Sequence, residues 1–219
     1  MTGEEFVEEM HATLWQLLSV GDAALARLKE AVGQAGVPGL LRKALRQEME
    51  AAEIAAGWVG STLQTEVKLA FARQAGDEAR HYLLLAGRLE ELASPPDDPS
   101  GGCRIPSKLF RYLETLDTTV ERVAAGQFAQ EAVGCKANEL FIAFCEEAGD
   151  HTTAELYRVH IQPDEQRHHQ WGRELLAALA VDSRRQAAAR RVIQTTLELA
   201  DELRLLGQSR LNVETLPGS

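Results

Sequence analysis

The five-residue stretch Asp77-Glu78-Ala79-Arg80-His81 recurs, with one change, as Asp164-Glu165-Gln166-Arg167-His168. Each copy contains Glu-x-x-His. Residues three apart on a helix lie on one face, so each copy directs a carboxylate and an imidazole the same way. From average residue usage, fewer than roughly one chain in a thousand of this size holds even one Asp-Glu-x-Arg-His by chance. The repeat therefore predicts two helices that face a shared metal site.

The composition limits the classes of protein to be considered. The chain has 219 residues and a net charge of -10. A nucleic-acid binder needs a basic stripe, so we expect no nucleic-acid partner. No run of 18 apolar residues occurs and no apolar signal segment follows Met1, so we expect no membrane contact and a cytoplasmic location. The cysteines Cys103, Cys135 and Cys145 form no C-x-x-C pair, which excludes a zinc ribbon and a rubredoxin module.

Turn residues and capping patterns divide the chain into expected helices. A capping box at Thr2-x-x-Glu5 opens a first helix over about 3–33, with Gly21-Asp22 as a candidate interruption. Four metal-bearing helices are expected at about 39–58, 62–93, 107–148 and 151–180, and a last helix runs from Asp182 to about 206. A stretch rich in proline and glycine, 94–106, separates the second of the four from the third.

Two further carboxylate ligands are expected on the helices that precede the motifs. Over 39–58, Glu48 shares its stripe with apolar residues, namely Leu41, Leu45, Ala52, Ala55 and Val59. Burial of a bare carboxylate is very costly, so Glu48 is the predicted ligand. Glu50 and Glu53 lie among charged residues and are predicted to be ordinary solvated side chains.

Over 107–148 the two candidates are Glu131 and Glu139. Glu131 lies on a largely apolar stripe, with Val120, Ala124, Phe128, Cys135, Asn138 and Ile142, whereas the stripe of Glu139 is more polar. Glu131 precedes its motif glutamate by 34 residues, close to the 30 that separate Glu48 from Glu78. Two similar antiparallel hairpins need similar offsets, so Glu131 is favoured.

The predicted metal ligands are Glu48, Glu78, His81, Glu131, Glu165 and His168. Four carboxylates and two imidazoles balance the charge of two divalent ions. On the template of metal-binding four-helix bundles, these are two iron ions, with manganese or a mixed pair as alternatives. His169 is expected to be a bystander, because it lies about 100° around the helix from His168. The remaining histidines are expected to be structural or at the surface: His11, His151 and His160.

At these residues the chain resembles the ferritin-like di-iron carboxylate superfamily. The repeated motif is similar to that of hydroxylase subunits of bacterial multicomponent monooxygenases and, more loosely, of ribonucleotide reductase small subunits. The resemblance covers the four metal-bearing helices, and this chain is far shorter than those subunits. It implies an all-α fold, namely a ferritin-like four-helix bundle with additional N- and C-terminal helices, in one domain over 1–219.

The resemblance also implies roles for the other motif residues. In those relatives the aspartate before the ligand glutamate hydrogen-bonds the histidine ligand of the opposite helix. Carried over, Asp77 and Asp164 would each hold the histidine of the other motif, and Arg80 and Arg167 would neutralise them. The alternative is that Asp77 and Arg80 form an ordinary surface ion pair. Cys135, one turn after Glu131, either lines an oxygen or substrate pocket or is a small core residue.

Several features separate the chain from individual relatives. The position of the radical-bearing tyrosine of reductase subunits holds Leu85, so a stable tyrosyl radical is not expected. Storage ferritins carry a single Glu-x-x-His, and the extra site glutamate and rubredoxin domain of rubrerythrin are absent from the sequence. Pro163, just before the second motif, either is a tolerated irregularity or aims Glu165 inward.

The sequence thus predicts an oxidoreductase whose two irons activate O₂ to oxidise or hydroxylate a small organic substrate. No flavin or iron–sulfur motif occurs, so electrons would come from a separate reductase. The alternatives are a ferroxidase or peroxide-handling protein, like rubrerythrin or bacterioferritin, without an organic substrate, and a non-catalytic metal-binding protein. An apolar cavity beside the irons would favour the first and a hollow cage the second. An apolar stripe on the last helix predicts a homodimer.

Overall fold

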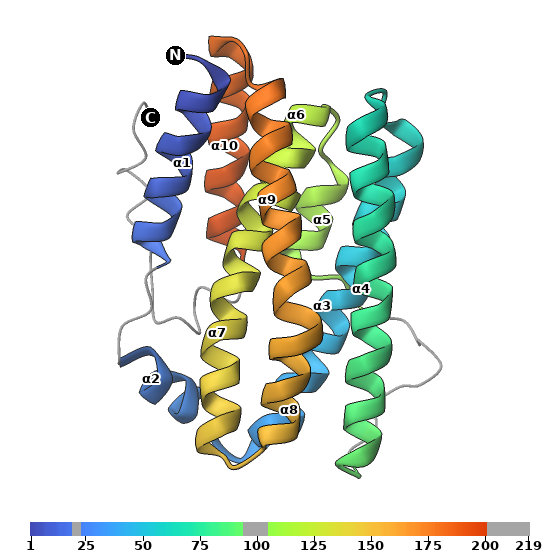
Figure 1. Cartoon of the computed structure of the whole chain (residues 1–219), viewed down its shortest axis with the longest axis vertical. Coiled ribbons are helices and arrows are strands. Elements are labelled where there is room, and N and C mark those ends of the chain that lie inside the picture. Colours follow the sequence, from blue (N-terminus) through green and yellow to red (C-terminus); the bar gives the residue numbers. More distant parts are fainter. Residues whose placement is uncertain (19–22, 94–104, 201–219) are drawn as a thin grey trace.

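The computed structural model describes residues 1–18, 23–93 and 105–200. All regular secondary structure in these residues is helical (Figure 1). The α-helices are α1 Gly3–Leu17, α2 Ala23–Val32, α3 Gly36–Ser61, α4 Thr65–Glu91, α5 Lys108–Glu114, α6 Thr119–Val123, α7 Glu131–Glu147, α8 His151–Leu156, α9 Gln162–Leu179 and α10 Ser183–Leu199. The 3₁₀ turn η1 Gly33–Ala35 and the π-helical segments η2 Ala124–Gln130 and η3 Tyr157–Ile161 join some of them. The prediction of an all-α fold is confirmed.

Four helical segments lie side by side and carry the two motifs and the two lone glutamates. Helices α3 and α4 form a hairpin joined at residues 62–64, and α7 packs beside α9 (Figure 1). Helix α4 also packs against α9, which brings the two motif-bearing helices together. Helices α1 and α10 add a further layer over α9 and η2. Each predicted metal-bearing helix therefore has a counterpart, with shifted boundaries.

The largest difference from the expected helices lies within 107–148. The structure ends α5 at Glu114 and begins α6 at Thr119, with an N-cap at Thr118. The Thr118 side chain accepts the backbone N–H of Glu121, and the Glu121 carboxylate accepts from the Thr118 backbone in return. This capping box starts a new helix at Thr119, so the prediction of one continuous helix over 107–148 is wrong.

The other boundaries differ for local reasons. Helix α3 begins at Gly36, earlier than the expected start at about 39 and before Pro38, because Gly33 and Gly36 take positive φ angles and make the turn there. Proline is tolerated in a first helical turn, where its missing N–H has no partner to lose. The expected interruption at Gly21-Asp22 and most of the 94–106 linker lie outside the described residues.

Two π-helical segments precede the inward glutamates of the second hairpin. Segment η2 ends directly before Glu131, and η3 ends four residues before Glu165. Pro163 lies in the first turn of α9, so its missing N–H falls where the wider π turn gives way to the α-helix. Each π turn changes the rotation of the residues that follow it, so these segments set the direction of the two glutamates.

Helix α10 buries its apolar stripe against its own chain, where Val192, Ile193 and Leu197 are nearly inaccessible. Because this stripe is already covered within the described residues, it does not require a second copy of the chain. The homodimer stays a prediction. Each described helix is too short or too polar to cross a lipid bilayer.

Candidate metal centre

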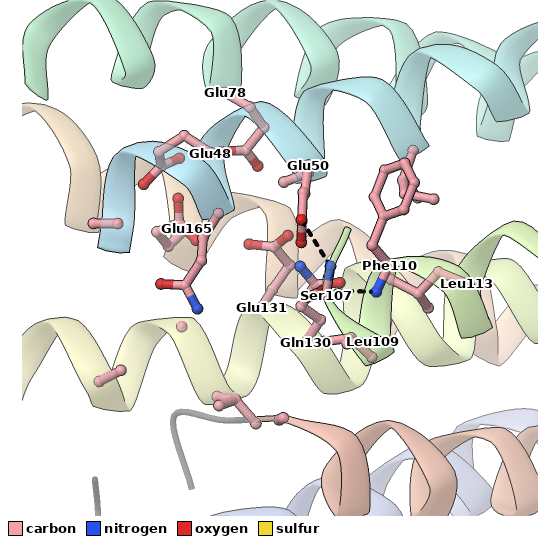
Figure 2. Close-up of a pocket in the computed structure, with 18 of the residues that line it drawn as sticks. Glu48, Glu50, Glu78, Ser107, Leu109, Phe110, Leu113, Gln130, Glu131 and Glu165 are labelled. Atoms are coloured by element: carbon pink, nitrogen blue, oxygen red, sulfur yellow. Dashed lines mark hydrogen bonds between the residues drawn. The ribbon is translucent and has the colours of Figure 1, made fainter. Parts of the chain in front are cut away.

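The structure brings the six predicted ligands together in one buried cluster. Helix α3 contributes Glu48, α4 contributes Glu78 and His81, and α9 contributes Glu165 and His168. Glu131 comes from the first residue of α7. Figure 2 shows the side chains of Glu48, Glu78, Glu131 and Glu165 directed into the same space. Both imidazoles are fully buried, and Glu78 and Glu131 are at most 3% exposed. Convergence from four helices is the geometry that the motif spacing predicts.

The six residues form two overlapping groups, each able to hold one ion. One consists of Glu48, Glu78, His81 and Glu165, and the other of Glu78, Glu131, Glu165 and His168. Within each group the potential ligand atoms lie within 4.8 Å of one another. Glu78 and Glu165 belong to both groups, so each would contribute to holding either ion. This sharing is the arrangement expected of a two-metal site.

Each imidazole turns its Nδ1 atom toward the carboxylates. Nδ1 of His81 lies 3.3 Å from Glu48, 3.2 Å from Glu78 and 3.4 Å from Glu165. Nδ1 of His168 lies 3.4 Å from Glu78 and 3.7 Å from Glu131, both of its own group. The Nδ1 atoms are therefore the candidate metal-binding nitrogens.

The opposite nitrogen of each imidazole meets an aspartate of the other motif. Nε2 of His81 lies 3.2 Å from Oδ2 of Asp164, and Nε2 of His168 lies 3.1 Å from Oδ2 of Asp77. This is the crossed pairing that the resemblance implies. A carboxylate at Nε2 fixes the proton on that atom, which leaves the Nδ1 lone pair free for a metal ion.

Two arginines accompany these aspartates. Arg80 forms an ion pair with Asp164, and Arg167 pairs with Asp164 and approaches Asp77 at 3.7 Å. An ordinary surface pair between Asp77 and Arg80 does not describe this arrangement, because Asp77 is bonded to His168 of the other helix. The hydrogen bond from His168 and the nearby arginines lower the pKa of Asp77, so its carboxylate stays ionised.

The electrostatics of the cluster suit ions of positive charge. Burial alone lowers the pKa of His168, but the hydrogen bond to Asp77 and the nearby carboxylates of Glu131 and Glu78 raise it to about 12. Burial has the same lowering effect on His81, and its three glutamate neighbours raise that pKa far above the ordinary value. Without metal, both imidazoles thus hold protons that compensate the carboxylates.

The carboxyl groups of the cluster titrate differently from one another. Burial raises the pKa of Glu48 and of Glu131 well above the ordinary value, and the neighbouring carboxylates add to this effect. The pKa of Glu78 is held well below the ordinary value, because hydrogen bonds from both imidazoles outweigh its burial. The protons of the cluster are thus shared among strongly coupled groups, and divalent ions would replace them.

Three buried atoms test whether the cluster fits metal ions. Glu131 Oε2, Glu165 Oε1 and His168 Nδ1 have no hydrogen-bond partner in the described residues. Such atoms cost free energy when left unpaired, and all three belong to residues of one group, the one that contains His168. Carboxylate oxygens and imidazole nitrogens are ligands for iron and manganese, so the residues present fit these ions.

Two residues near the cluster hold or accommodate its glutamates. Gln74 donates to Glu131 at 2.6 Å and lies 3.4 Å from Glu78, and it thereby joins the two hairpins. At Gly134, a Cβ atom would lie 3.1 Å from a carboxylate oxygen of Glu165, so glycine leaves room for that side chain.

A cavity of about 130 Å³ opens beside the cluster (Figure 2). Its floor includes the four cluster glutamates, and most of its walls are apolar side chains of α3, α5 and α7. The apolar wall residues are Ala44, Ala51, Ile54, Leu109, Phe110, Leu113, Val133, Ala137, Leu199 and Ala200. Gln47, Gln130 and Asn138 supply polar groups. The cavity is thus a largely apolar space with the carboxylate cluster at one end.

Two cavity residues were missed by the sequence reading. Glu50 is not an ordinary solvated charge: it lines the cavity and accepts the backbone N–H of Ser107 at 3.0 Å. Tyr157, in η3, also lines the cavity, and burial raises its pKa well above the ordinary value. No local sequence pattern identifies either residue. The partner of Glu50, Ser107, is distant in sequence, and the π turn changes the helix face on which Tyr157 lies.

The remaining candidates lie outside the cluster. Cys135 is buried but does not line this cavity, and burial raises the pKa of its thiol. His169 turns away from the cluster, with Nδ1 2.9 Å from the Phe128 carbonyl oxygen and Nε2 3.2 Å from His11. His169 and His11 are therefore structural, as expected, while Cys135 fits the small core residue of the two interpretations.

Comparison with known protein families places the chain in one of them. A family model described as "Protein of unknown function (DUF455)" matches residues 14–202. The chain belongs to the DUF455 family. The DUF455 match runs from within α1 to just beyond α10 and includes all six cluster residues. No curated protein and no solved structure matches this DUF455 chain.

Proposed function

We propose that this DUF455 protein is a di-iron carboxylate oxidoreductase, built on a ferritin-like four-helix bundle, that activates O₂ to oxidise or hydroxylate a small organic substrate. One observation carries the proposal: two metal-binding groups share Glu78 and Glu165 at the floor of a largely apolar cavity. The paired groups support two ions, and the cavity supports an organic substrate beside them.

The donor set favours iron over zinc. The cluster offers four carboxylates and two imidazoles, and no cysteine belongs to either group among the described residues. Structural zinc sites use cysteine and histidine, whereas carboxylate-rich sites in helical bundles hold iron or manganese. Bound at these positions, two ferrous ions supply the electrons and the open coordination positions that O₂ reduction needs.

The protein's own residues would prepare and tune the site. Asp77 and Asp164 accept the Nε2–H of the two imidazoles and keep Nδ1 free to bind metal. Gln74 donates to Glu131 and limits its rotation. Arg80 and Arg167 both form ion pairs with the Asp164 carboxylate and hold it against His81. These contacts hold the donors in place before metal binds, which lowers the cost of ordering them.

The size of the cavity bounds the substrate. An apolar cavity of about 150 Å³ in another protein holds a molecule as large as benzene. The cavity here is about 130 Å³, so the buried part of a substrate would be of similar size. Its largely apolar walls suit an organic molecule, which a protein that handles only iron ions does not require.

Anaerobic titration with Fe(II), followed by exposure to O₂, tests the proposal. We expect two irons per chain and a new optical absorption after exposure to O₂. O₂ consumption should accelerate with a small apolar substrate, and a set of benzene-sized alkenes, aromatics and amines provides the first screen. Rapid O₂ consumption that no compound in the screen alters, with assembly into a shell that mineralises excess iron, would instead support iron storage. Binding of fewer than two irons would overturn the di-iron proposal.

A further inference from the structure

The indole ring of Trp171 contacts one of the candidate metal-binding imidazoles. Trp171 follows His168 by one turn on α9, and the two ring centroids are 5.6 Å apart with an interplanar angle of 37°. Trp171 is only half-buried. It therefore extends from the solvent-exposed face of the bundle to a residue of the metal cluster, within one ring-to-ring contact.

Arginines surround the exposed side of this indole. The guanidinium carbons of Arg73 and Arg167 lie 5.6 Å and 5.7 Å from its ring centroid. Arg80 is exposed on the same side of α4. The aspartates that these arginines approach are turned inward: Asp164 is buried and Asp77 is half-buried. Three exposed arginines and one exposed carboxylate, that of Glu174 three residues after Trp171, surround the indole, so positive charge predominates at this surface, on a chain whose net charge is -10.

Apolar side chains frame the arginines along α4. Leu69 lies one turn before Arg73 and Leu83 lies three residues after Arg80, which places them on the same helix face. Leu69 is 64% exposed and Leu83 is 69% exposed. Exposed leucines beside arginines and a tryptophan have the composition of a protein-binding surface, since Trp and Arg dominate binding energy at interfaces.

This surface is separate from the substrate cavity. Helices α4 and α9 contribute only Glu78 and Glu165 to the cavity, and the other wall residues come from α3, α5, η2, α7, η3 and the end of α10. The outer faces of α4 and α9 therefore lie on a different side of the cluster. A partner bound around Trp171 would leave the cavity open to substrate.

We propose that the outer face of α4 and α9 around Trp171 docks an acidic protein that carries a one-electron cofactor. Electrons pass from that cofactor through Trp171 to His168. The inference rests on the proposed function, since two ferric ions need two electrons to become ferrous. Two molecules of the carrier each lose one electron, and each ferric ion gains one. Charge complementarity identifies the partner, because the arginines would attract an acidic surface and repel a basic one.

Binding is tested with an acidic plant-type [2Fe–2S] ferredoxin as the probe and the full iron-loaded chain. We expect binding that weakens as salt is added, because exposed charges are screened. Arg73→Glu should weaken binding at least about five-fold at low salt, because it reverses a charge beside Trp171. Arg73 is exposed and lies against the indole, and it belongs to neither metal-binding group among the described residues, so its substitution should leave the metal site intact. Arg184→Glu, at an exposed arginine of α10, is the matched control and should leave the Kd unchanged.

Electron transfer is tested by mixing the reduced ferredoxin with the oxidised iron-loaded protein and following both chromophores. Trp171→Leu should slow reduction about ten-fold or more with an unchanged Kd, and Trp171→Phe should restore part of the rate. Trp15→Leu is the matched control. Trp15 is also half-buried and stacks on His169 at 5.0 Å, but His169 does not belong to the cluster.

The outcomes separate this inference from the proposed function. If two irons bind but ferredoxin does not, or Arg73→Glu and Arg184→Glu behave alike, the docking surface is wrong while the di-iron proposal stands. If Trp15→Leu rather than Trp171→Leu slows reduction, the electrons pass on the α1 side. If the chain binds no iron, the proposed function fails first, as metal analysis shows.

Discussion

Asp164 on α9 lies 3.2 Å from Nε2 of His81 on α4, so a residue of one motif orients the metal-binding residue of the other. The reciprocal contact joins Asp77 to His168 at 3.1 Å. The two motifs therefore act as one unit. Displacement of either helix would disturb both imidazoles at once. A single substitution in one motif should therefore weaken metal binding by the histidine of the other motif.

The contact between Asp77 and His168 predicts the effect of replacing a residue that contacts a candidate ligand without being one itself. Asp77→Ala should weaken iron binding about 10- to 100-fold at the group that contains His168, because the imidazole loses the partner that fixes its proton. Equilibrium metal titration measures this. Asp182→Ala is a suitable control: Asp182 caps α10, so its loss should cost about 1 kcal/mol of stability without changing iron affinity. Equal iron affinities of the two variants would show that Asp77 does not support metal binding.

Loss of a ligand should be distinguishable from loss of a nearby carboxylate. His81→Ala should lose at least one iron per chain, because His81 contacts three glutamates of one group. Glu53→Ala should lose none, since Glu53 lies exposed on another face of α3. Iron analysis of the two purified variants provides the measurement. Equal loss in both would show that the assignment of helix faces is wrong.

The cluster was predictable from sequence because its residues obey helical periodicity. The motif residues are three apart, and Glu48 and Glu131 each stand on a stripe of buried apolar side chains. A carboxylate on such a stripe has few explanations other than pairing or metal binding. Local periodicity was enough to identify the inward side chains, because each helix buries one face regardless of which helices pack against it.

Other features depend on tertiary contacts and were not predictable in the same way. Glu50 appeared to be a solvated charge because its partner, the backbone of Ser107, lies on a different segment. The π segments before Glu131 and Glu165 carry no sequence signature, since packing decides where a helix widens.

The helix start at Thr118, by contrast, was predictable from sequence, because Thr118-x-x-Glu121 has the form of a capping box.

Metal uptake should release protons. The pKa of His168 in the metal-free protein is raised to about 12, so its imidazole holds a proton at pH 7 that a metal ion must displace. The metal-free state then binds more protons than the loaded state, so metal affinity should rise with pH and fall on acidification. Anaerobic Mn(II) titration with a pH-stat measures the release. Full occupancy without proton release would mean that the imidazoles are neutral before metal binds.

The close approach of α9 and η2 predicts opposite effects for two glycine substitutions. A Cβ at Gly172 would lie 2.4 Å from the Gln127 carbonyl oxygen, so Gly172→Ala forces two backbones apart and should destabilise by about 1–3 kcal/mol. At Gly87, within α4, a Cβ meets nothing within 4 Å, so Gly87→Ala should stabilise by about 0.5–1 kcal/mol. Urea unfolding of the metal-free proteins compares them. A neutral Gly172→Ala would show that α9 and η2 separate easily.

His169 should make the stability of the metal-free protein depend on pH. Burial lowers its pKa to about 4, below the ordinary value of 6.5, although the Phe128 carbonyl opposes this effect. Between these two values the unfolded chain binds a proton at His169 that the folded chain does not. The free energy of unfolding should therefore fall as the pH drops from about 6.5 to about 4, by up to about 3 kcal/mol from this residue.

Comparison with His169→Gln isolates this contribution, because the carboxylates of the cluster titrate in both proteins. Glutamine can still donate to the Phe128 carbonyl and carries no titrating proton. Urea unfolding at pH 7 and pH 4.5 should give a smaller loss of stability for His169→Gln than for the natural chain. Equal losses would mean that His169 is protonated without breaking its contacts, and that the α1–α9 packing tolerates a buried charge.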